Sequence, residues 1–413
     1  MDFEPSDRAK ALLERVRAFM DEHVYPNERE AEEALDREVD AETPFPQILV
    51  ELREKARSEG LWNLALPDPE VGSGLSNLDY GVVSEEIGRA TLVAPYCFNV
   101  QPPDSGNMEI LGEHATPAQR EKWLEPLLDG DIRSCYSMTE PDTAGSDPTG
   151  LACAAVLDGG DWVINGKKWW TTNALGAQVA IVMAVTDPDG PKHARATMIL
   201  VPTDTKGFTM VRPLSNMGHT AGPGHWEIHY EDCRVPADLS TLGGRGAGFK
   251  ISQDRLGPGR IHHCMRLIGV AERALEMMCE RAQSREMFGT ALAERQFIQD
   301  FIATSRAEID QARLVTWHAA WKLDQVGNRA AREELSITKL AVPTMALNVV
   351  DRAIQVFGGA GVSDDTPLAG MYRYNRMLRI GDGADEVHKQ VIARMELAKV
   401  GKRATATATP VAS

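Results

Sequence analysis

Apolar side chains recur at intervals of three and four residues along the first third of the chain, a spacing that places them on one face of a helix. The first helix is predicted by five residues with this spacing: Leu12, Leu13, Val16, Phe19 and Met20. Further helices are expected over 45–59, 78–90 and 117–128. Thr116 followed by Pro117 marks the start of the last of these, since Thr caps the first amides and Pro fits the first helical position.

Between residues 133 and 242 the helical spacing gives way to short β-rich runs. Asp158-Gly159-Gly160-Asp161 separates two such runs and predicts a strand–turn–strand unit, and Asn165-Gly166 predicts a second turn. Two more strands are expected over 180–185 and 197–201. Several short strands at close spacing are typical of a small sheet or barrel domain.

Long helical patterns return after residue 245, over 261–284, 296–326 and 334–356. Each is longer than an average helix, which predicts antiparallel rods packed in a bundle. The predicted fold class is therefore α+β and multidomain. It has a helical domain over 1–132, a small β-barrel or β-sheet domain over 133–242 and a long four-helix bundle over 243–400. The remaining residues, 401–413, are mostly Ala and Thr and are expected to form a disordered tail.

Composition narrows the classes of function. The chain has 413 residues, with 44 Lys and Arg against 60 Asp and Glu and a net charge of −16. So acidic a surface repels phosphate backbones and argues against a nucleic-acid partner. The six cysteines lie at least 15 residues apart, so no C-x-x-C pair suggests a metal site. With no run of eighteen apolar residues and no apolar leader, we expect a soluble, cytoplasmic protein without membrane insertion.

Two segments near the helical-to-β boundary carry candidate chemistry. The first, over 136–147, reads YSMTEPDTAGSD. Small hydroxyl and glycine residues let backbone amides approach an oxygen-rich ligand, although composition alone favours an ordinary surface loop. The second, over 165–174, reads NGKKWWTTNA. A strand with one tryptophan ring on each face would explain its adjacent tryptophans.

Taken together and in this order, the T-E-P…G-S-D and K-x-W-x-T-N stretches resemble the acyl-CoA dehydrogenase family. Members of that family have a central β domain between two helical domains and bind FAD. The resemblance places Trp170 and Thr172 beside the flavin ring and Thr139 at its pyrimidine edge. It places Ser146 where the cofactor pyrophosphate meets the acyl-CoA. Two further residues are assigned to the cofactor in the same way: Tyr136 and Ser137.

The C-terminal region supplies more matches. Arg285-Glu286-Met287-Phe288-Gly289, followed by Gln296, resembles a family stretch whose Arg and Gln reach the FAD of a neighbouring subunit. A guanidinium suits a pyrophosphate because its donors form a fixed fork. The segment from Gln355 to Gly361 resembles the family's Q-x-x-G-G-x-G turn, where the backbone of Gly358 and Gly359 approaches the partner's FAD. A helix ended by a glycine cap would also explain this segment.

The family's reaction removes an α-proton from an acyl-CoA thioester, which requires a desolvated carboxylate as the base. Most members carry a Glu shortly after an R-x-x-R run, and the matching position here is Asp382. An Asp-Gly turn with no catalytic role is the alternative interpretation. Some members place the base just before an Arg on the first long C-terminal helix, but Gly259 stands there and offers no carboxylate. The resemblance assigns substrate-binding residues (Ser146, Arg260, Gly381, Asp382 and Gly383) and further cofactor-binding residues (Ala384 and Glu386).

Two features resemble one subgroup, the dehydrogenase domain of two human enzymes that fuse it to a kinase-like domain. They are the extra residue in TEPDTAGSD and the R-I-x-D-G-x-D-E-V-H ending. Asp382 is one methylene shorter than the usual Glu, and Gly381 and Ala384 replace a bulkier Tyr and Thr. We therefore expect a site that accepts long, branched or oxygenated acyl chains. His262 and His263 lie one turn beyond Arg260 and could line the acyl cavity, but these two and His388 are more often packing or surface residues, which is the interpretation we favour.

The resemblance predicts FAD-dependent conversion of acyl-CoA to trans-2-enoyl-CoA in fatty acid β-oxidation. It implies electron transfer to an electron-transfer flavoprotein and a homodimer or homotetramer. Three alternatives stay open at this point. One is a related flavoenzyme, an acyl-CoA oxidase or a flavin monooxygenase. Another is a non-catalytic CoA- or flavin-binding protein. The third is an enzyme acting on 4-hydroxyacyl-CoA or 4-phosphoryloxyacyl-CoA, which would need a separate kinase.

Overall fold

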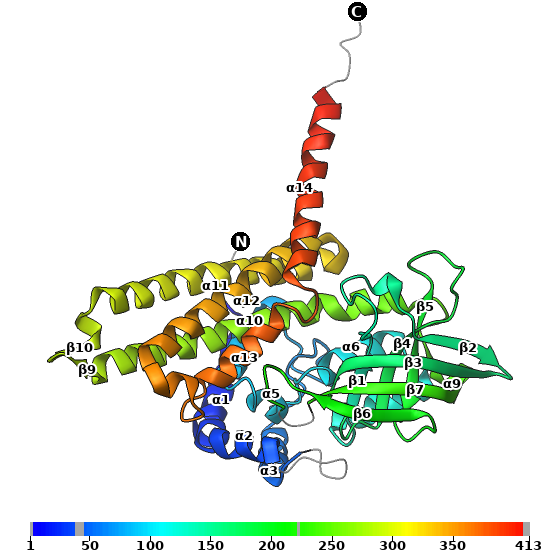
Figure 1. The fold of residues 1–413 in the computed structure, drawn as a ribbon, viewed down its shortest axis with the longest axis horizontal. Helices are drawn as coiled ribbons and strands as arrows, with labels where there is room; N and C mark the ends of the chain where they lie inside the picture. Colours follow the sequence, from blue (N-terminus) through cyan, green and yellow to red (C-terminus); the bar gives the residue numbers. More distant parts are fainter. Residues whose placement is uncertain (1–2, 38–44, 221–223, 408–413) are drawn as a thin grey trace, which may run out of the picture. The chain divides into compact units, whose positions relative to one another are not determined.

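The computed structural model describes residues 3–37, 45–220 and 224–407. The chain divides into two compact units. The sheet unit spans Pro5–Gly259, and the bundle unit comprises Arg260–Ser413 together with Met1–Glu4. Figure 1 shows the helices and strands of each unit.

The sheet unit begins with a group of helices. Their bounds are α1 (Asp7–Phe19), α2 (Glu28–Arg37), α3 (Gln47–Ser58), α4 (Asn77–Gly88), α5 (Ala94–Cys97), α6 (Asp104–His114), α7 (Pro117–Gln119) and α8 (Glu125–Asp129). Ser6 and Ser76 cap α1 and α4, because each side chain accepts a hydrogen bond from an amide of the first turn. Thr116 caps α7 in a reciprocal box with Gln119, so the helix start expected there is confirmed.

The helix expected over 117–128 is interrupted. A π-helical turn, Arg120–Leu124, separates α7 from α8. Pro126 lies in the first turn of α8 and has no N–H to continue the regular hydrogen-bond ladder. The backbone therefore widens before it instead of continuing as a single α-helix.

One mixed sheet of eight strands follows in the order β6-β7-β3-β2-β4-β5-β8, with β1 paired to β4. The strands are β1 (Ser134–Ser137), β2 (Ala154–Asp158), β3 (Asp161–Thr172), β4 (Val179–Val185), β5 (Ala196–Pro202), β6 (Phe208–Leu214), β7 (His225–Pro236) and β8 (Thr241–Leu242). A short helix, α9 (Ala237–Ser240), joins the last two strands. Strand β4 alternates between two cores: Ala180 and Val182 pack on one face, and Val179 and Ile181 on the other.

The turn predicted at Asn165-Gly166 is wrong. Both residues lie inside β3, where the pairing with β7 shifts register between Ile164 and Gly166. Glycine is favoured both in β-bulges and in turns, so the Asn-Gly pair alone does not distinguish the two. Gly166 has φ 151°, and a Cβ on it would lie 2.6 Å from the Cα of Cys153. The glycine is thus required by the close approach of Cys153, the residue directly before β2.

The bundle unit is built from long helices. They are α10 (Gly248–Ser284, which begins in the sheet unit), α11 (Gln296–Ala330), α12 (Arg332–Phe357), α13 (Leu368–Leu378) and α14 (Asp385–Thr407). A small hairpin, β9 (Glu286–Met287) and β10 (Thr290–Ala291), lies between α10 and α11. Helix α10 starts well before the expected residue 261 and continues through Pro258, because an internal proline removes only one hydrogen bond of a long helix.

The tail expected to be disordered over 401–413 is helical over 401–407, where it continues α14. Alanine favours helix, and this stretch contains no Gly or Pro after Gly401. Residues 408–413 lie outside the described residues.

Within the described residues, one segment is long and apolar enough to cross a bilayer, Arg332–Val362. Half of its apolar window is buried. Val342, Ala346, Val349 and Ala353 of α12 pack in the core of the bundle with residues of α10 and α11. A central helix of a helical bundle is apolar for this reason, so burial in the bundle core accounts for its composition.

Candidate active site

A β-bulge presents Trp170 at the surface of the sheet unit. The pairing of β3 with β7 shifts register between Lys168 and Thr171, and Trp170 lies in that shift with φ 52°. A bulge re-aims the side chain of its extra residue. The indole of Trp170 is 36% exposed, whereas Thr171 and Lys168 on either side of the bulge are buried. The sheet therefore offers an aromatic face at the position predicted to contact the flavin.

Thr172 and His225 meet beside this indole. Thr172 Oγ1 lies 2.9 Å from Nδ1 of His225, whose ring centre is 5.2 Å from that of Trp170. Burial lowers the pKa of His225 to about 4, so the ring is neutral near pH 7. Sequence reasoning missed His225, because it lies on β7 and only the strand pairing brings it opposite Thr172.

The loop that follows β1 is held against β3 by a buried ion pair. Lys168 Nζ lies 2.8 Å from Glu140 Oε1, and Glu140 also accepts hydrogen bonds from the amides of Ala152 and Cys153. Burial opposes the charged form of Glu140, but Lys168 and these amides outweigh it and hold the carboxyl pKa below its ordinary value. The carbonyl of Thr139 accepts from the amide of Trp169 at 2.9 Å. Thr139 is thereby fixed next to the bulge.

The other cofactor residues predicted in this unit differ in accessibility. Ser146 is exposed in the loop. The hydroxyl of Ser137 is fully buried and accepts a hydrogen bond from Tyr230 at 3.0 Å, so this side chain faces the interior of the sheet unit. The Tyr136 ring is half-buried, with the guanidinium of Arg255 4.1 Å from its centre.

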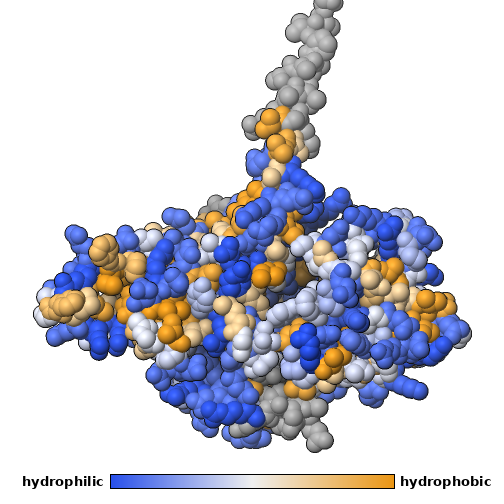
Figure 2. All heavy atoms as spheres, in the orientation of Figure 1, coloured by the Kyte–Doolittle hydropathy of each residue, from blue (hydrophilic) through white to orange (hydrophobic). Residues whose placement is uncertain are grey.

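The bundle unit exposes the residues predicted to reach a neighbouring subunit's FAD. They are Arg285, Phe288, Gln296, Gln355, Gly358 and Gly359. Phe288 is 90% exposed in the β9–β10 turn, and Phe297 at the start of α11 is 83% exposed. Figure 2 shows hydrophobic side chains gathered at this end of the unit. Helix α12 ends at Phe357 with Gly358 as its cap residue, which confirms the glycine cap. A Cβ on Gly358 or Gly359 would meet no described atom within 4 Å.

Asp382 lies in a tight turn between α13 and α14. Its backbone is left-handed, with φ 57°, and that of Gly383 has φ 105°. Nε of Arg260, on α10, donates to the carbonyl of Asp382 at 2.9 Å and so ties the turn to the bundle. Burial lowers the pKa of Arg260, and the nearby Asp382 opposes that shift. The Asp382 side chain is 26% exposed, which keeps it accessible while removing most of its water.

A histidine contacts the carboxylate. Nε2 of His263, on α10, lies 3.3 Å from Oδ2 of Asp382. The interpretation of His263 as a packing or surface residue missed this contact. Its signal in the sequence is the three-residue spacing of Arg260, His263 and Arg266, which places all three on one helix face. His262 and His388 are buried, and burial lowers their pKa values to about 3 and about 4.

The remaining predicted residues flank this turn. Gly381 has ordinary backbone angles, and a Cβ on it would meet only the carbonyl of Met377, at 3.7 Å. Gly383 is tightly packed, since a Cβ there would lie 2.9 Å from His388 Nε2. Ala384 is half-buried, while Glu386 is exposed and lies 3.4 Å from Lys389. The structure thus brings Arg260, Gly381, Asp382 and Gly383 together.

Family models of the acyl-CoA dehydrogenases match all three parts of the chain: the N-terminal domain at 6–131, the middle domain at 135–233 and the C-terminal domain at 246–397. The chain belongs to the acyl-CoA dehydrogenase family. The resemblance drawn from its motifs and the three-part fold class expected from its sequence are both confirmed.

Known acyl-CoA dehydrogenases resemble nearly the whole chain. Acyl-CoA dehydrogenase family member 11 of Gallus gallus is 48% identical over 98% of this chain, which spans about half (52%) of that relative's length. A solved structure of a chain assigned to this family, from Mycobacterium abscessus, is 48% identical to this chain with a TM-score of 0.92. The match covers 96% of this chain and 100% of the Mycobacterium abscessus chain. A glutaryl-CoA dehydrogenase from Mycobacterium smegmatis in complex with FADH2 is 25% identical, with a TM-score of 0.78 and 94% of each chain covered.

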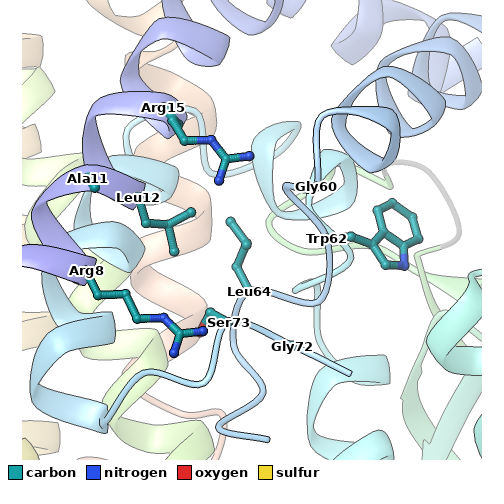
Figure 3. Close-up of a pocket in the computed structure, with 9 residues that line it drawn as sticks. All are labelled: Arg8, Ala11, Leu12, Arg15, Gly60, Trp62, Leu64, Gly72 and Ser73. Atoms are coloured by element: carbon teal, nitrogen blue, oxygen red, sulfur yellow. The ribbon is translucent and has the colours of Figure 1, made fainter. Parts of the chain in front are cut away.

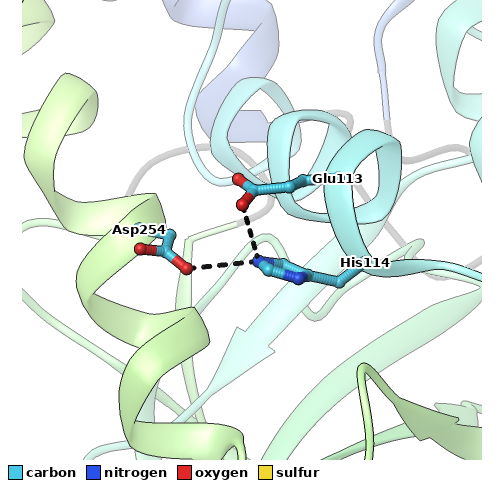
Figure 4. Close-up of side chains that lie close together, drawn as sticks. All are labelled: Glu113, His114 and Asp254. Atoms are coloured by element: carbon cyan, nitrogen blue, oxygen red, sulfur yellow. Dashed lines mark ion pairs between the residues drawn. The ribbon is translucent and has the colours of Figure 1, made fainter. Parts of the chain in front are cut away.

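Two further features of the sheet unit lie apart from the predicted acyl-CoA dehydrogenase residues. A pocket of about 270 Å³ opens between α1 and the loops after α3, with Arg8, Leu12, Arg15 and Trp62 among its lining (Figure 3). In a second cluster, His114 Nε2 lies 3.6 Å from a Glu113 oxygen and 3.3 Å from an Asp254 oxygen (Figure 4). Lys250 already lies 2.8 Å from Asp254 and neutralises part of its charge. Neither feature includes a residue of the acyl-CoA dehydrogenase motifs.

Proposed function

We propose that the protein oxidises acyl-CoA thioesters to trans-2-enoyl-CoA with FAD, and that Asp382 is the base. The observation that carries this proposal is the Asp382 carboxylate, which is mostly removed from water and contacted by His263, on a turn whose backbone carbonyl is held by Arg260. An α-C–H is a weak acid, so its proton passes only to a positioned, desolvated carboxylate. The Asp382 amide serves as one donor to the thioester oxygen, where negative charge develops as the proton leaves.

The residues present fit FAD. In the sheet unit, the Trp170 indole is exposed and the loop carrying Thr139 and Ser146 is held by the Glu140–Lys168 pair. In the bundle unit, exposed Arg285 has the donor geometry that suits a pyrophosphate. The bound FADH2 of the Mycobacterium smegmatis relative supports the same cofactor. FAD, when bound, accepts the hydrogen that leaves the β-carbon as hydride, and an electron-transfer flavoprotein then takes up the electrons.

The proposal includes a homo-oligomer. Arg285, Gln296 and the open backbone at Gly358 and Gly359 are exposed on the bundle unit, which also exposes Phe288 and Phe297. Exposed aromatic residues of this size mark a protein interface. A second copy of the chain would cover them and bring these residues to its own FAD.

The substrate class proposed is a long, branched or oxygenated acyl chain. Its support is the space beside Gly381, where an added Cβ would have only one neighbour within 4 Å. A 4-hydroxyacyl or 4-phosphoryloxyacyl chain belongs to the same class and is the alternative substrate of the same base.

The test is anaerobic titration of the purified yellow protein with a panel of thioesters, following bleaching of the flavin absorbance. The panel contains butyryl-, palmitoyl-, a branched and a 4-hydroxyacyl-CoA. Bleaching by palmitoyl-CoA or by the branched and oxygenated members is expected. A colourless protein, or a flavin that no member bleaches, would support the non-catalytic alternative. Much faster bleaching by butyryl-CoA than by every other member would contradict the proposed substrate class.

A further inference from the structure

The His263 ring lies between a carboxylate and a guanidinium. On one side, Nε2 is 3.3 Å from Oδ2 of Asp382, and on the other, Nδ1 is 3.1 Å from Nη2 of Arg266. His263 and Arg266 are both buried on α10. The three side chains therefore form a chain of contacts inside the bundle unit that ends at Asp382.

Arg266 determines which nitrogen of His263 carries the proton. A guanidinium has donors and no acceptor, so Nδ1 must accept from Arg266 and cannot carry a hydrogen. A neutral imidazole has one N–H, which then resides on Nε2 and is directed at Asp382. A second proton on Nδ1 would set two donors and two positive charges against each other, so Arg266 also opposes protonation of the ring.

We propose that His263 is a positioning residue for Asp382: its neutral ring donates Nε2–H to Oδ2, in the tautomer that Arg266 imposes. This inference rests on the proposed function of Asp382 as the base. An aspartate reaches one methylene less far than a glutamate, so the direction of its carboxylate determines whether it meets the α-carbon. A hydrogen bond to one oxygen fixes that direction and leads the substrate's proton to the other.

The hydrogen bond also favours the ionised base. Burial of a carboxylate favours its protonated form, and a donor to the charged form opposes this effect. Among the described residues, the charged groups around the turn include Arg260 and Arg266 on α10, Arg332 and Lys339 on α12, and the pair of Arg379 and Asp385. Other titratable groups nearby are the imidazoles of His262 and His388 and the thiol of Cys264.

Two of these neighbours are directed elsewhere. Lys339 Nζ donates to the carbonyl of Leu378. Asp385 accepts two hydrogen bonds from Arg379, at 2.8 and 2.6 Å. His263 is directed at the carboxylate itself and is therefore placed to fix its orientation.

The experiment measures the rate of flavin bleaching by palmitoyl-CoA between pH 5.5 and 9 in the full-length, FAD-loaded protein. His263→Phe removes the hydrogen bond to Asp382. The pH below which the bleaching rate falls (the acid limb of the profile) is therefore expected to rise by about one to two pH units. At pH 7 the variant is expected to bleach at least about tenfold more slowly than wild type. His263→Gln places an amide N–H at a similar reach and is expected to return the limb toward wild type. His262→Phe is the matched control for a lost buried imidazole.

A second readout does not use the flavin reaction. The thermal unfolding midpoints of His263→Phe, Asp382→Ala and the double variant are compared, and non-additive shifts are expected because the two side chains interact. If His263→Phe does not fold by circular dichroism, His263→Asn takes its place, since its shorter amide cannot reach Oδ2.

Two results would overturn the inference while leaving the base intact. One is an acid limb and rate unchanged in His263→Phe, with bleaching still abolished in Asp382→Asn. The other is an acid limb that moves equally in His262→Phe, because lost packing would then be the cause. Bleaching at the wild-type rate in Asp382→Asn would instead contradict the proposed function on which the inference rests.

Discussion

Nε of Arg260 donates a hydrogen bond of 2.9 Å to the backbone carbonyl of Asp382, across 122 residues of sequence. A left-handed aspartate costs backbone energy and persists only where its surroundings hold it. We therefore expect Arg260→Gln to lower the free energy of unfolding by about 1–3 kcal/mol, because a carbonyl in the interior loses its charged donor. Flavin bleaching should slow in parallel as the turn loosens.

Urea unfolding and stopped-flow bleaching check this prediction together. Arg394→Gln, on the exposed face of α14, is the control and should change stability by less than about 0.5 kcal/mol. If Arg260→Gln has the same free energy of unfolding and the same rate of flavin bleaching as Arg394→Gln, the hydrogen bond from Arg260 to the Asp382 carbonyl does not hold the turn.

Gly381 tests the proposed substrate class. Its ordinary backbone and open surroundings should let Gly381→Tyr fold normally, while the new ring occupies space beside Asp382. We expect bleaching by branched and palmitoyl thioesters to fall about tenfold or more, and that by butyryl-CoA to fall less, because overpacking excludes the bulkier chains. Gly381→Ala is the matched control with almost no added volume. If the bleaching rates of the thioesters keep the same order in Gly381→Tyr, Gly381 does not determine the substrate specificity.

The buried pair of Glu140 and Lys168 should be essential to the loop that carries Thr139. Glu140→Gln leaves a buried ammonium without its counter-ion, which we expect to cost about 3–5 kcal/mol in the free energy of unfolding and to weaken retention of FAD. The double variant with Lys168→Met should recover part of that loss, since no uncompensated charge then remains.

Urea unfolding and the flavin-to-protein absorbance ratio after gel filtration provide the measurements. Glu33→Gln breaks the exposed Arg29–Glu33 pair of α2 and should cost less than about 0.5 kcal/mol. Equal effects of the two substitutions would show that burial does not strengthen the Glu140 contact.

Buried histidines predict a loss of stability in mild acid. Folding lowers the pKa of His262 from 6.5 to about 3, and of His225 and His388 to about 4. Below pH 6.5 the unfolded chain binds protons that the folded chain excludes, so stability is complete above pH 6.5 and declines as pH falls toward 4. Each histidine should account for about 1 kcal/mol of the loss between pH 7.5 and 5.5.

Glu109 acts in the opposite direction, because burial raises its pKa to about 7 and the folded state gains its proton first. The informative measurement is therefore the difference between wild type and His262→Phe, in which Glu109 cancels. Urea unfolding at the two pH values should show a smaller decline in the variant by about 1 kcal/mol. An identical decline in both proteins would mean that folding does not lower the pKa of His262.

Parts of the fold could be predicted from the sequence where the signal lies between residues that are close together along the chain. Thr116 before Pro117 is a start signal that acts within one helical turn, and the structure has the cap at that residue. Asn165-Gly166 is equally local but ambiguous, because glycine serves both a hairpin turn and a bulge. Only the approach of Cys153, which directly precedes β2, decides between them.

In the candidate site, too, residues in local motifs could be predicted from the sequence, and residues placed by long-range packing could not. Asp382, Trp170 and Thr172 belong to contiguous motifs, so a single sequence suffices to locate them. His263 and His225 each meet their partner through packing of distant elements, α10 against the turn before α14 and β7 against β3. No local pattern fixes the rotation of a long helix or the register of a bulged strand, which is why both histidines were missed as members of the site.

Single-turnover reduction of the FAD-loaded Asp382→Asn variant by palmitoyl-CoA, measured beside Asp382→Glu, tests directly whether Asp382 is the base. Asparagine keeps the shape and cannot take a proton, so we predict flavin bleaching slowed by at least about a thousandfold, while Asp382→Glu retains measurable bleaching. Bleaching of Asp382→Asn at the wild-type rate would contradict the assignment of Asp382 as the base.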